Sequence, residues 1–137
     1  MNSLTYRHDH RVRYAECTIG NHVYYARYLD ILEEARGEFF RTLGRSFLEW
    51  QEADLIFPVT EARVRYKASA RYDDLVRVEL WVSQLEGVRL GFDYRLTRAD
   101  DLLLAEASTL HVFASLREKP RRPPPELCQA LTAYLRS

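Results

Sequence analysis

The sequence has few cysteines, no net charge and no long apolar run, and each absence argues against a class of protein. Its two cysteines, Cys17 and Cys128, form no CxxC pair, and no HExxH motif occurs, so we expect neither a disulfide framework nor a metal site. Lys plus Arg and Asp plus Glu both number 20, which argues against a general nucleic-acid binder. No apolar run approaches the roughly 18 residues of a membrane span, and the polar start MNSLTYRHDH is unlike a signal peptide. We therefore expect a cytoplasmic protein that does not insert into membranes.

The composition is that of an ordinary globular domain. Of the 137 residues, 47% are hydrophobic and 29% are charged, which is enough apolar material for a real core. A chain of this length fits one domain, so we expect residues 1–137 to fold as a single unit.

Hydrophobic periodicity predicts the order of the elements. Residues 5–16 alternate as a strand, residues 17–24 read as a loop, and residues 25–43 carry apolar side chains at helical spacing until Gly44 ends the helix. Gly37, inside that helix, indicates either close packing of another backbone or a tolerated flaw. Four further strands follow, and a short helix ends the chain; we place these elements at residues 60–68, 76–83, 89–96, 102–115 and 126–135.

Short links between the later strands predict an antiparallel meander. A sheet with one apolar face must be covered, and the helix at 25–43 is the only element large enough. We therefore predict an α+β fold in which a curled, antiparallel five-stranded sheet wraps around one long central helix, with a short C-terminal helix. One helix leaves a sheet edge exposed, which favours a homo-oligomer, either a dimer or a tetramer.

The segment from Arg13 to Arg36, RYAECTIGNHVYYARYLDILEEAR, puts a polar loop directly before this helix. The first N–H groups of a helix have no partner within it, so they can bind a carbonyl oxygen or an anion. The segment resembles the hotdog-fold acyl-CoA thioesterases, in particular the 4-hydroxybenzoyl-CoA thioesterase family. The resemblance is carried by 13–17, Gly20, 22–29 and 33–36, and downstream by 62–66 and 70–74.

The resemblance implies the hotdog fold and a mechanism. In the family, a loop carboxylate acts as base or nucleophile on a thioester, and a backbone N–H at the start of the central helix polarises the carbonyl. By position, the N–H donor falls at Tyr25 and the carboxylate falls at Thr18, which cannot ionise near neutral pH. Thr18 can orient a water or bind the thioester carbonyl, or it simply caps a turn.

Other polar residues near Thr18 are candidates for the missing base. Glu16 points to the same side as Thr18 if residues 16–18 are extended, or else it is a surface carboxylate paired with Arg13 or Arg27. His22 is a candidate general base, with an ordinary loop histidine as the alternative. Asn21 and His22 together could position a water.

Further candidates lie outside the loop. Tyr24 and neighbouring tyrosines are candidates to line an acyl or aryl pocket. Arg63, Arg65 and Arg89 suit the phosphates of coenzyme A, with a solvated strand face as the alternative. Of the adjacent helix residues Glu33 and Glu34, at most one faces a cleft. We expect His8 and His10 in the core or an interface and His111 to be buried and hydrogen-bonded, and we assign Cys17 no base that would make it a nucleophile.

Two functional hypotheses follow. The first is an acyl-CoA thioester hydrolase that needs no metal or bound organic cofactor, with coenzyme A entering as part of the substrate. The second is a non-catalytic acyl-CoA or acyl-carrier binding protein that has lost the catalytic carboxylate at Thr18. A hotdog hydratase is disfavoured because the helix carries no separate His/Asp pair.

Overall fold

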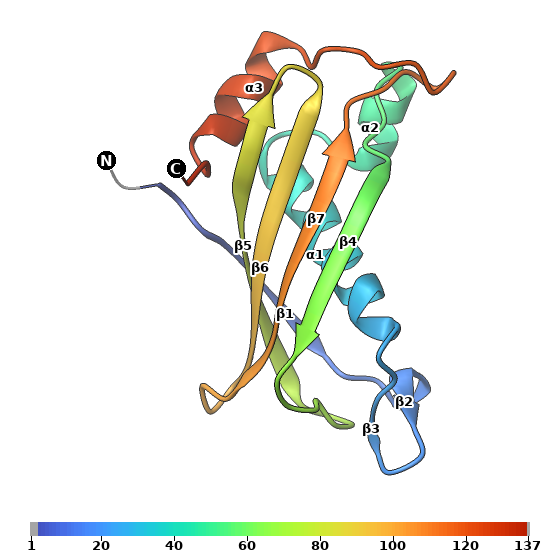
Figure 1. Ribbon diagram of the computed structural model, residues 1–137, viewed down its shortest axis with the longest axis vertical. Helices are drawn as coiled ribbons and strands as arrows, with labels where there is room; N and C mark the ends of the chain where they lie inside the picture. The colour runs from blue at the N-terminus through green and yellow to red at the C-terminus, as the bar shows by residue number, and fades with distance from the viewer. Residues whose placement is uncertain (1–2, 137) are drawn as a thin grey trace.

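A computed structural model describes residues 3–136 and has a five-stranded antiparallel sheet with a long helix lying across one face (Figure 1). The helix, α1, runs over Arg27–Thr42. The sheet has the strand order β1-β5-β6-β7-β4. Its strands are β1 (Tyr6–Arg11), β4 (Val59–Tyr66), β5 (Leu75–Glu86), β6 (Arg89–Arg98) and β7 (Leu103–Val112). The smaller elements are the turn η1 (Tyr14–Glu16), the strands β2 (Cys17–Thr18) and β3 (His22–Val23), and the helices α2 (Phe47–Glu52) and α3 (Pro125–Thr132).

The core forms where the apolar stripe of α1 meets alternate residues of the sheet. Leu32, Ala35 and Phe39 of α1 are fully buried, and so are Val78 and Leu80 of β5. Helical and strand periodicity each gather these side chains on one face, and burying those faces is the main source of stability. The predicted α+β hotdog architecture, with one helix against a five-stranded antiparallel sheet, is confirmed.

Several predicted boundaries are wrong. The first strand ends at Arg11 instead of residue 16, because residues 14–16 form a short 3-10 turn. Helix α1 spans 27–42 instead of 25–43. Helix α2 was not predicted, since six residues are too few to show a period, although Ser46 and Glu49 form the capping box that marks its start.

The predicted meander is only partly correct. Strands β5, β6 and β7 are consecutive neighbours, but β4 pairs with β7 and not with β5. The link at 67–74 therefore crosses from β4, at one edge of the sheet, to β5, which lies next to the other edge strand, β1. Its beginning still follows the sheet, since Lys67 and Ala68 donate backbone hydrogen bonds to Leu104. Strand β7 lies inside the sheet, as its two apolar faces predicted.

The edge strand β4 is open to solvent. All its residues except the half-buried Val64 are exposed. A long edge strand offers unpaired N–H and C=O groups to a second chain.

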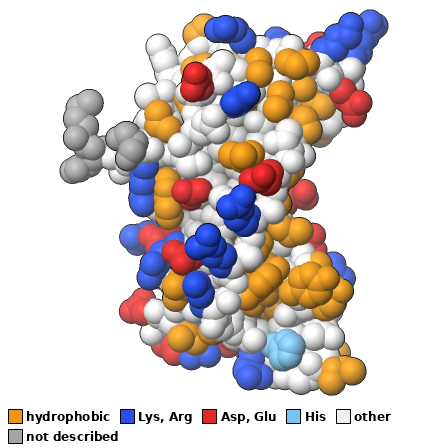
Figure 2. Space-filling view, in the orientation of Figure 1, with side chains coloured by type: hydrophobic (Ala, Val, Ile, Leu, Met, Phe, Trp, Pro, Cys, Tyr) orange, Lys and Arg blue, Asp and Glu red, His pale blue; other side chains and the backbone are white. Residues whose placement is uncertain are grey.

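The sheet face away from α1 carries charged side chains of both signs, with hydrophobic side chains among them (Figure 2). Opposite charges alternate across all five strands in register, in the order Arg65, Glu106, Arg95, Glu79 and Arg7. Such cross-strand pairs contribute roughly 0.2–1 kcal/mol each. Among the described residues, no helix is long and apolar enough to cross a membrane.

We expect Gly37→Ala to stabilise the fold. A Cβ at position 37 would lie 3.5 Å from the ring of Phe47 in α2, an ordinary contact, and no other backbone approaches it. The substitution should therefore raise the free energy of unfolding by about 0.5–1 kcal/mol, because glycine disfavours the helix.

Urea denaturation measures this, with Gly91→Ala as the contrasting variant. A Cβ at position 91 would lie 2.7 Å from Ser83 Oγ, so that variant should lose stability. A Gly37→Ala protein less stable than the wild type would contradict this account.

Candidate functional site

A pocket of about 500 Å³ lies where the loop hairpin, the start of α1 and the end of β4 meet. It contains three of the residues predicted to be catalytic, Thr18, His22 and Tyr25, and also Tyr24. The remaining lining residues are Val23, Tyr28, Tyr66, Lys67, Ala68 and Ser69.

The small hairpin of β2 and β3 brings Thr18 and His22 together. The two residues are direct antiparallel partners, so their side chains project from the same face. Gly20 and Asn21 turn the chain between them with positive φ angles. A Cβ at Gly20 would lie 3.3 Å from the His22 ring, so glycine leaves room for that ring as well as making the turn. Asn21 is exposed and does not line the pocket.

The crossover at 67–74 is hydrogen-bonded to the hairpin and holds it in place. Val23 donates its backbone N–H to Ala70 O at 2.9 Å, and Arg71 Nη1 donates to Gly20 O at 3.2 Å. The second segment of the family resemblance therefore supports the loop of the first.

The start of α1 leaves a backbone donor without a partner. Arg27, Tyr28 and Leu29 donate to the carbonyls three residues earlier, so the hydrogen-bonded turns begin at Tyr24. Within residues 3–136, the N–H of Tyr25 donates to no protein acceptor, and no side chain caps this helix. The predicted free amide at the pocket is therefore present, two residues before the regular helix begins.

Tyrosines form the walls of the pocket. Tyr66 donates its hydroxyl to Tyr25 O at 2.9 Å, and Tyr28 accepts from the Ala70 N–H at 3.1 Å. The Tyr24 and Tyr25 rings lie 4.8 Å apart between centroids. Burial raises the pKa of Tyr28 and of Tyr66, so both phenols remain protonated. These rings offer an apolar surface with hydroxyl groups at its rim.

Glu16 does not share a side with Thr18, so that geometric expectation is wrong. Residue 16 closes the 3-10 turn instead of lying in an extended run. Its carboxylate accepts from His10 Nε2 at 2.8 Å and from the Arg13 N–H at 2.7 Å. It lines a separate cavity of about 240 Å³ together with Asp30.

His10 is held between two carboxylates. Its Nδ1 lies 2.8 Å from Glu34 Oε2, and its Nε2 faces Glu16. A neutral imidazole has one N–H, so it can donate to only one of the two carboxylates at a time. His8 also binds Glu34, at 2.6 Å. The side-chain hydrogen bonds of this cluster connect β1 to α1 and to Glu16. The backbone carbonyl of Glu16 in turn accepts from the Tyr24 N–H, which connects the cluster to the loop.

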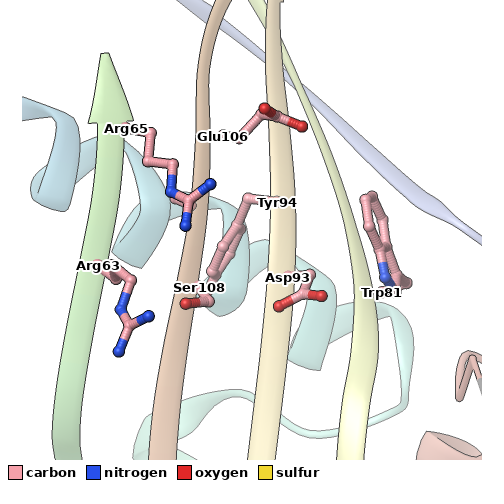
Figure 3. A pocket seen from close by; sticks show the side chains of 8 residues that line it. Arg63, Arg65, Trp81, Asp93, Tyr94, Glu106 and Ser108 are labelled. Carbon is pink, nitrogen blue, oxygen red and sulfur yellow. The ribbon is translucent and has the colours of Figure 1, made fainter.

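The three arginines predicted to bind coenzyme A phosphates lie on the face of the sheet away from α1. Val64 packs toward the core, so Arg63 and Arg65 point away from α1. They border a hollow of about 300 Å³ beside Asp93, Glu106 and Ser108 (Figure 3). Arg89 alternates with the buried Leu90 and is exposed as well. The fold does not bring these arginines to the loop pocket.

Sequence reasoning missed two polar residues of interest. Ser69 lines the loop pocket, but nothing in the sequence singles it out. Arg36 lines another cavity, and its spacing of four from both Leu32 and Phe40 would have placed it within the apolar stripe.

Other predicted contacts are present. His111 is buried and hydrogen-bonded as expected. Burial raises the pKa of Cys17, which leaves it a poor thiolate nucleophile. In residues 3–136 no group of three His, Cys, Asp or Glu side chains is placed to hold a metal ion.

Comparison with known proteins shows the family of this chain. Residues 12–131 match the thioesterase-like superfamily, and the chain belongs to it. The chain is 34% identical to the acyl-CoA thioester hydrolase YbgC of Escherichia coli O6:H1, covering 90% of this chain and 93% of that protein. It is 40% identical to the acyl-CoA thioesterase YbgC of Haemophilus influenzae over 72% of each chain.

A solved structure gives the same result for the fold. The 1,4-dihydroxy-2-naphthoyl-CoA thioesterase from Synechocystis superposes with a TM-score of 0.87 at 25% identity, covering 93% of this chain and 96% of that one. The family resemblance inferred from the loop and helix residues is therefore confirmed, while the role of each site residue stays a prediction.

We expect Glu34→Gln to change the acid sensitivity of the fold. Burial alone raises the pKa of Glu34, but hydrogen bonds and charge from His8 and His10 outweigh it, and the net pKa is below the usual 4.5. A lowered pKa stabilises the fold above the unfolded value, and this contribution is lost as the pH falls through the folded value. The wild type should therefore exceed the variant in stability at pH 7, and the gap should close below about pH 4.5.

Denaturation at a series of pH values measures the gap. Glu38→Gln, a half-buried carboxylate of the same helix that pairs with Arg41 and not with a histidine, serves as the control and should show a much smaller gap. Equal pH profiles for the two variants would show that the histidine cluster does not stabilise the carboxylate.

Proposed function

We propose that this protein hydrolyses acyl-CoA thioesters in the loop pocket. The observation that carries the proposal is the unpartnered Tyr25 N–H at the start of α1, in a pocket that also presents Thr18 and His22. The names of the relatives support the class of substrate, since both YbgC proteins are described as acting on acyl-CoA thioesters.

In the proposed mechanism, the thioester oxygen accepts a hydrogen bond from the Tyr25 N–H. That donor stabilises the developing oxyanion more than the neutral carbonyl, which lowers the barrier. Removing one such donor in other enzymes costs roughly 3 kcal/mol. The partial positive charge at the helix start acts in the same direction.

The attacking group in this proposal is a water between Thr18 and His22. The Thr18 hydroxyl orients the water, and the His22 ring accepts its proton as oxygen attacks the carbonyl carbon. The carbon–sulfur bond then breaks, and the imidazolium returns the proton to the coenzyme A thiolate. The products are a carboxylic acid and free coenzyme A, and the scheme calls on no metal or organic cofactor.

The proposal includes a homodimer formed through β4. Antiparallel pairing of the exposed β4 with a second copy satisfies its free backbone groups. Pairing centred on the strand puts Val59 opposite Tyr66 of the second copy, so the α2 end of one protomer meets the loop pocket of the other. Pairing through β4 extends the sheet in its own plane and leaves Arg63, Arg65 and Arg89 on the face away from the loop pocket, so their contact with coenzyme A phosphates stays a prediction. A tetramer would add a second interface.

We also propose that the protein is cytoplasmic.

A non-catalytic acyl-CoA binding protein is the second candidate. Thr18 favours it, because the carboxylate position implied by the family resemblance holds a side chain that cannot act as a base. Under this reading, the pocket and the free amide hold the thioester without cleaving it.

Thiol release from a panel of short, long and aromatic acyl-CoAs separates the two functions. We expect wild-type turnover, a loss of about 100-fold in kcat for His22→Ala through loss of the base, and a smaller loss for Thr18→Val. Glu16→Gln should act through stability rather than chemistry, because its carboxylate faces His10.

Thr18→Asp is the deciding variant. Binding of acyl-CoA by an inactive wild type, with turnover appearing in Thr18→Asp, would replace the hydrolase with the binding protein. Neither binding nor turnover in any variant would remove the acyl-CoA assignment itself.

The dimer has its own test. Sedimentation equilibrium should give twice the chain mass of 16.2 kDa, or four times for the tetramer. A mass of 16.2 kDa at micromolar concentration would exclude the β4 pairing.

A further inference from the structure

A buried arginine lines a second cavity, away from the loop pocket. Arg36 of α1 is only 7% exposed, and the cavity it borders measures about 400 Å³. The cavity lies between α1, α2 and the start of β4. Its walls are mainly aromatic and apolar, with Phe40, Phe47, Phe57 and Phe92 among them.

Within residues 3–136, Arg36 makes one hydrogen bond, from Nη1 to the Tyr94 hydroxyl at 3.1 Å. Beyond Tyr94 the hydrogen bonds continue through Thr109 and His111 to the backbone carbonyl of Phe57. That carbonyl fixes which atom donates in each of these bonds. The carbonyl of Phe57 can only accept, so His111 Nδ1 carries the proton of that 3.0 Å bond. A neutral His111 then accepts at Nε2 from Thr109, which in turn accepts from Tyr94.

No residue in this series of hydrogen bonds supplies a negative charge to Arg36. Burial lowers the pKa of His111 to about 4, so the ring is neutral at pH 7. Burial also raises the pKa of Tyr94, which keeps the phenol protonated. Glu33 lines the same cavity, but in the described chain no carboxylate oxygen lies within 4.0 Å of the Arg36 guanidinium.

The guanidinium has donors left for a ligand. In residues 3–136, Trp50 Nε1 is the only fully buried side-chain nitrogen or oxygen without a partner. The unbonded nitrogens of Arg36 therefore reach accessible space, and the cavity is the space that Arg36 borders. A positive charge buried without a counter-ion is costly, and a ligand anion would offset that cost.

We propose that this Arg36 cavity binds the far end of the acyl group and selects acyl groups that combine an apolar, preferably aromatic, body with a terminal carboxylate. Aromatic walls suit the body, with the Phe40 and Phe57 rings 4.7 Å apart, and a guanidinium suits the carboxylate. That the bound group is the acyl part of a substrate rests on the proposed function. The preference for an aromatic anion is independent of it.

The position of the cavity fits the proposed dimer. Along α1, Arg36 is eleven residues from Tyr25, or roughly 16 Å, which separates the cavity from the loop pocket of its own protomer. Val59 lines the cavity, and Tyr66 lines the loop pocket. Pairing of β4 with a second copy brings these two residues opposite each other, so one substrate can reach both sites.

The test uses the intact protein with benzoate and benzamide, which have nearly the same shape and differ in charge. Both are titrated while the backbone amide resonances of Phe57 and His111 are followed by NMR. We expect saturable shifts with benzoate and about tenfold weaker binding of benzamide, since a charge-assisted bond is stronger than a neutral one. Equal affinities, or no shifts at these residues, would overturn the proposal.

Variants then assign the preference to Arg36. Arg36→Gln should abolish the preference for benzoate, Arg36→Lys should keep part of it, and Arg41→Gln, an exposed arginine of the same helix, should leave it unchanged. If Arg36→Gln does not fold, the wild-type contrast and Arg36→Lys still decide. A preference that survives Arg36→Gln would refute the assignment.

A kinetic comparison separates this proposal from the hydrolase function. With 4-carboxybenzoyl-CoA and 4-carbamoylbenzoyl-CoA as substrates, we expect kcat/KM to favour the carboxylate about tenfold in the wild type. Turnover without this preference would remove the Arg36 proposal and keep the hydrolase. Benzoate binding without any turnover would remove the hydrolase and keep the anion cavity.

Discussion

Burial of the apolar stripe of α1 against the sheet is the constraint on which the rest of this structure depends. Leu32, Ala35 and Phe39 set the rotation of the helix about its axis, and the sheet residues beneath them set its height. Once both are fixed, the first turn of the helix has only one place to lie. That place is beside the β2–β3 hairpin and the end of β4, where the Tyr25 N–H meets the loop pocket.

The same rotation distributes the polar residues of α1 among different surroundings. Glu34 turns toward β1 and receives hydrogen bonds from His8 and His10. Glu33 and Arg36 turn the other way, toward the aromatic cavity beside α2. Adjacent helix positions point about 100° apart, so two neighbouring carboxylates in one motif serve unrelated sites.

The fold was predictable from local pattern, and the site only in part. Period-two alternation and one long amphipathic stripe identified the sheet and its helix. The polar loop predicted free amides at the helix start, and the family resemblance placed the donor at Tyr25. The pairing of β4 with β7 was not predictable, because a short link between strands reads as a hairpin unless the crossover is seen. The contact between Glu16 and His10 was also not predictable, since it depends on the 3-10 turn at 14–16, where the sequence pattern predicted an extended strand.

What the sequence by itself determined is the long helix, the main strands and the polar loop directly before the helix, because these depend on residues close together along the chain. Turn residues, helical spacing and the polar loop act over a few positions, so their consequences can be read directly. The tertiary structure alone decided that Arg36 is buried with no carboxylate partner among residues 3–136 and that its hydrogen-bond partner there is Tyr94, 58 residues away. Burial and charge compensation depend on which distant strands pack against a helix, and no local pattern records that.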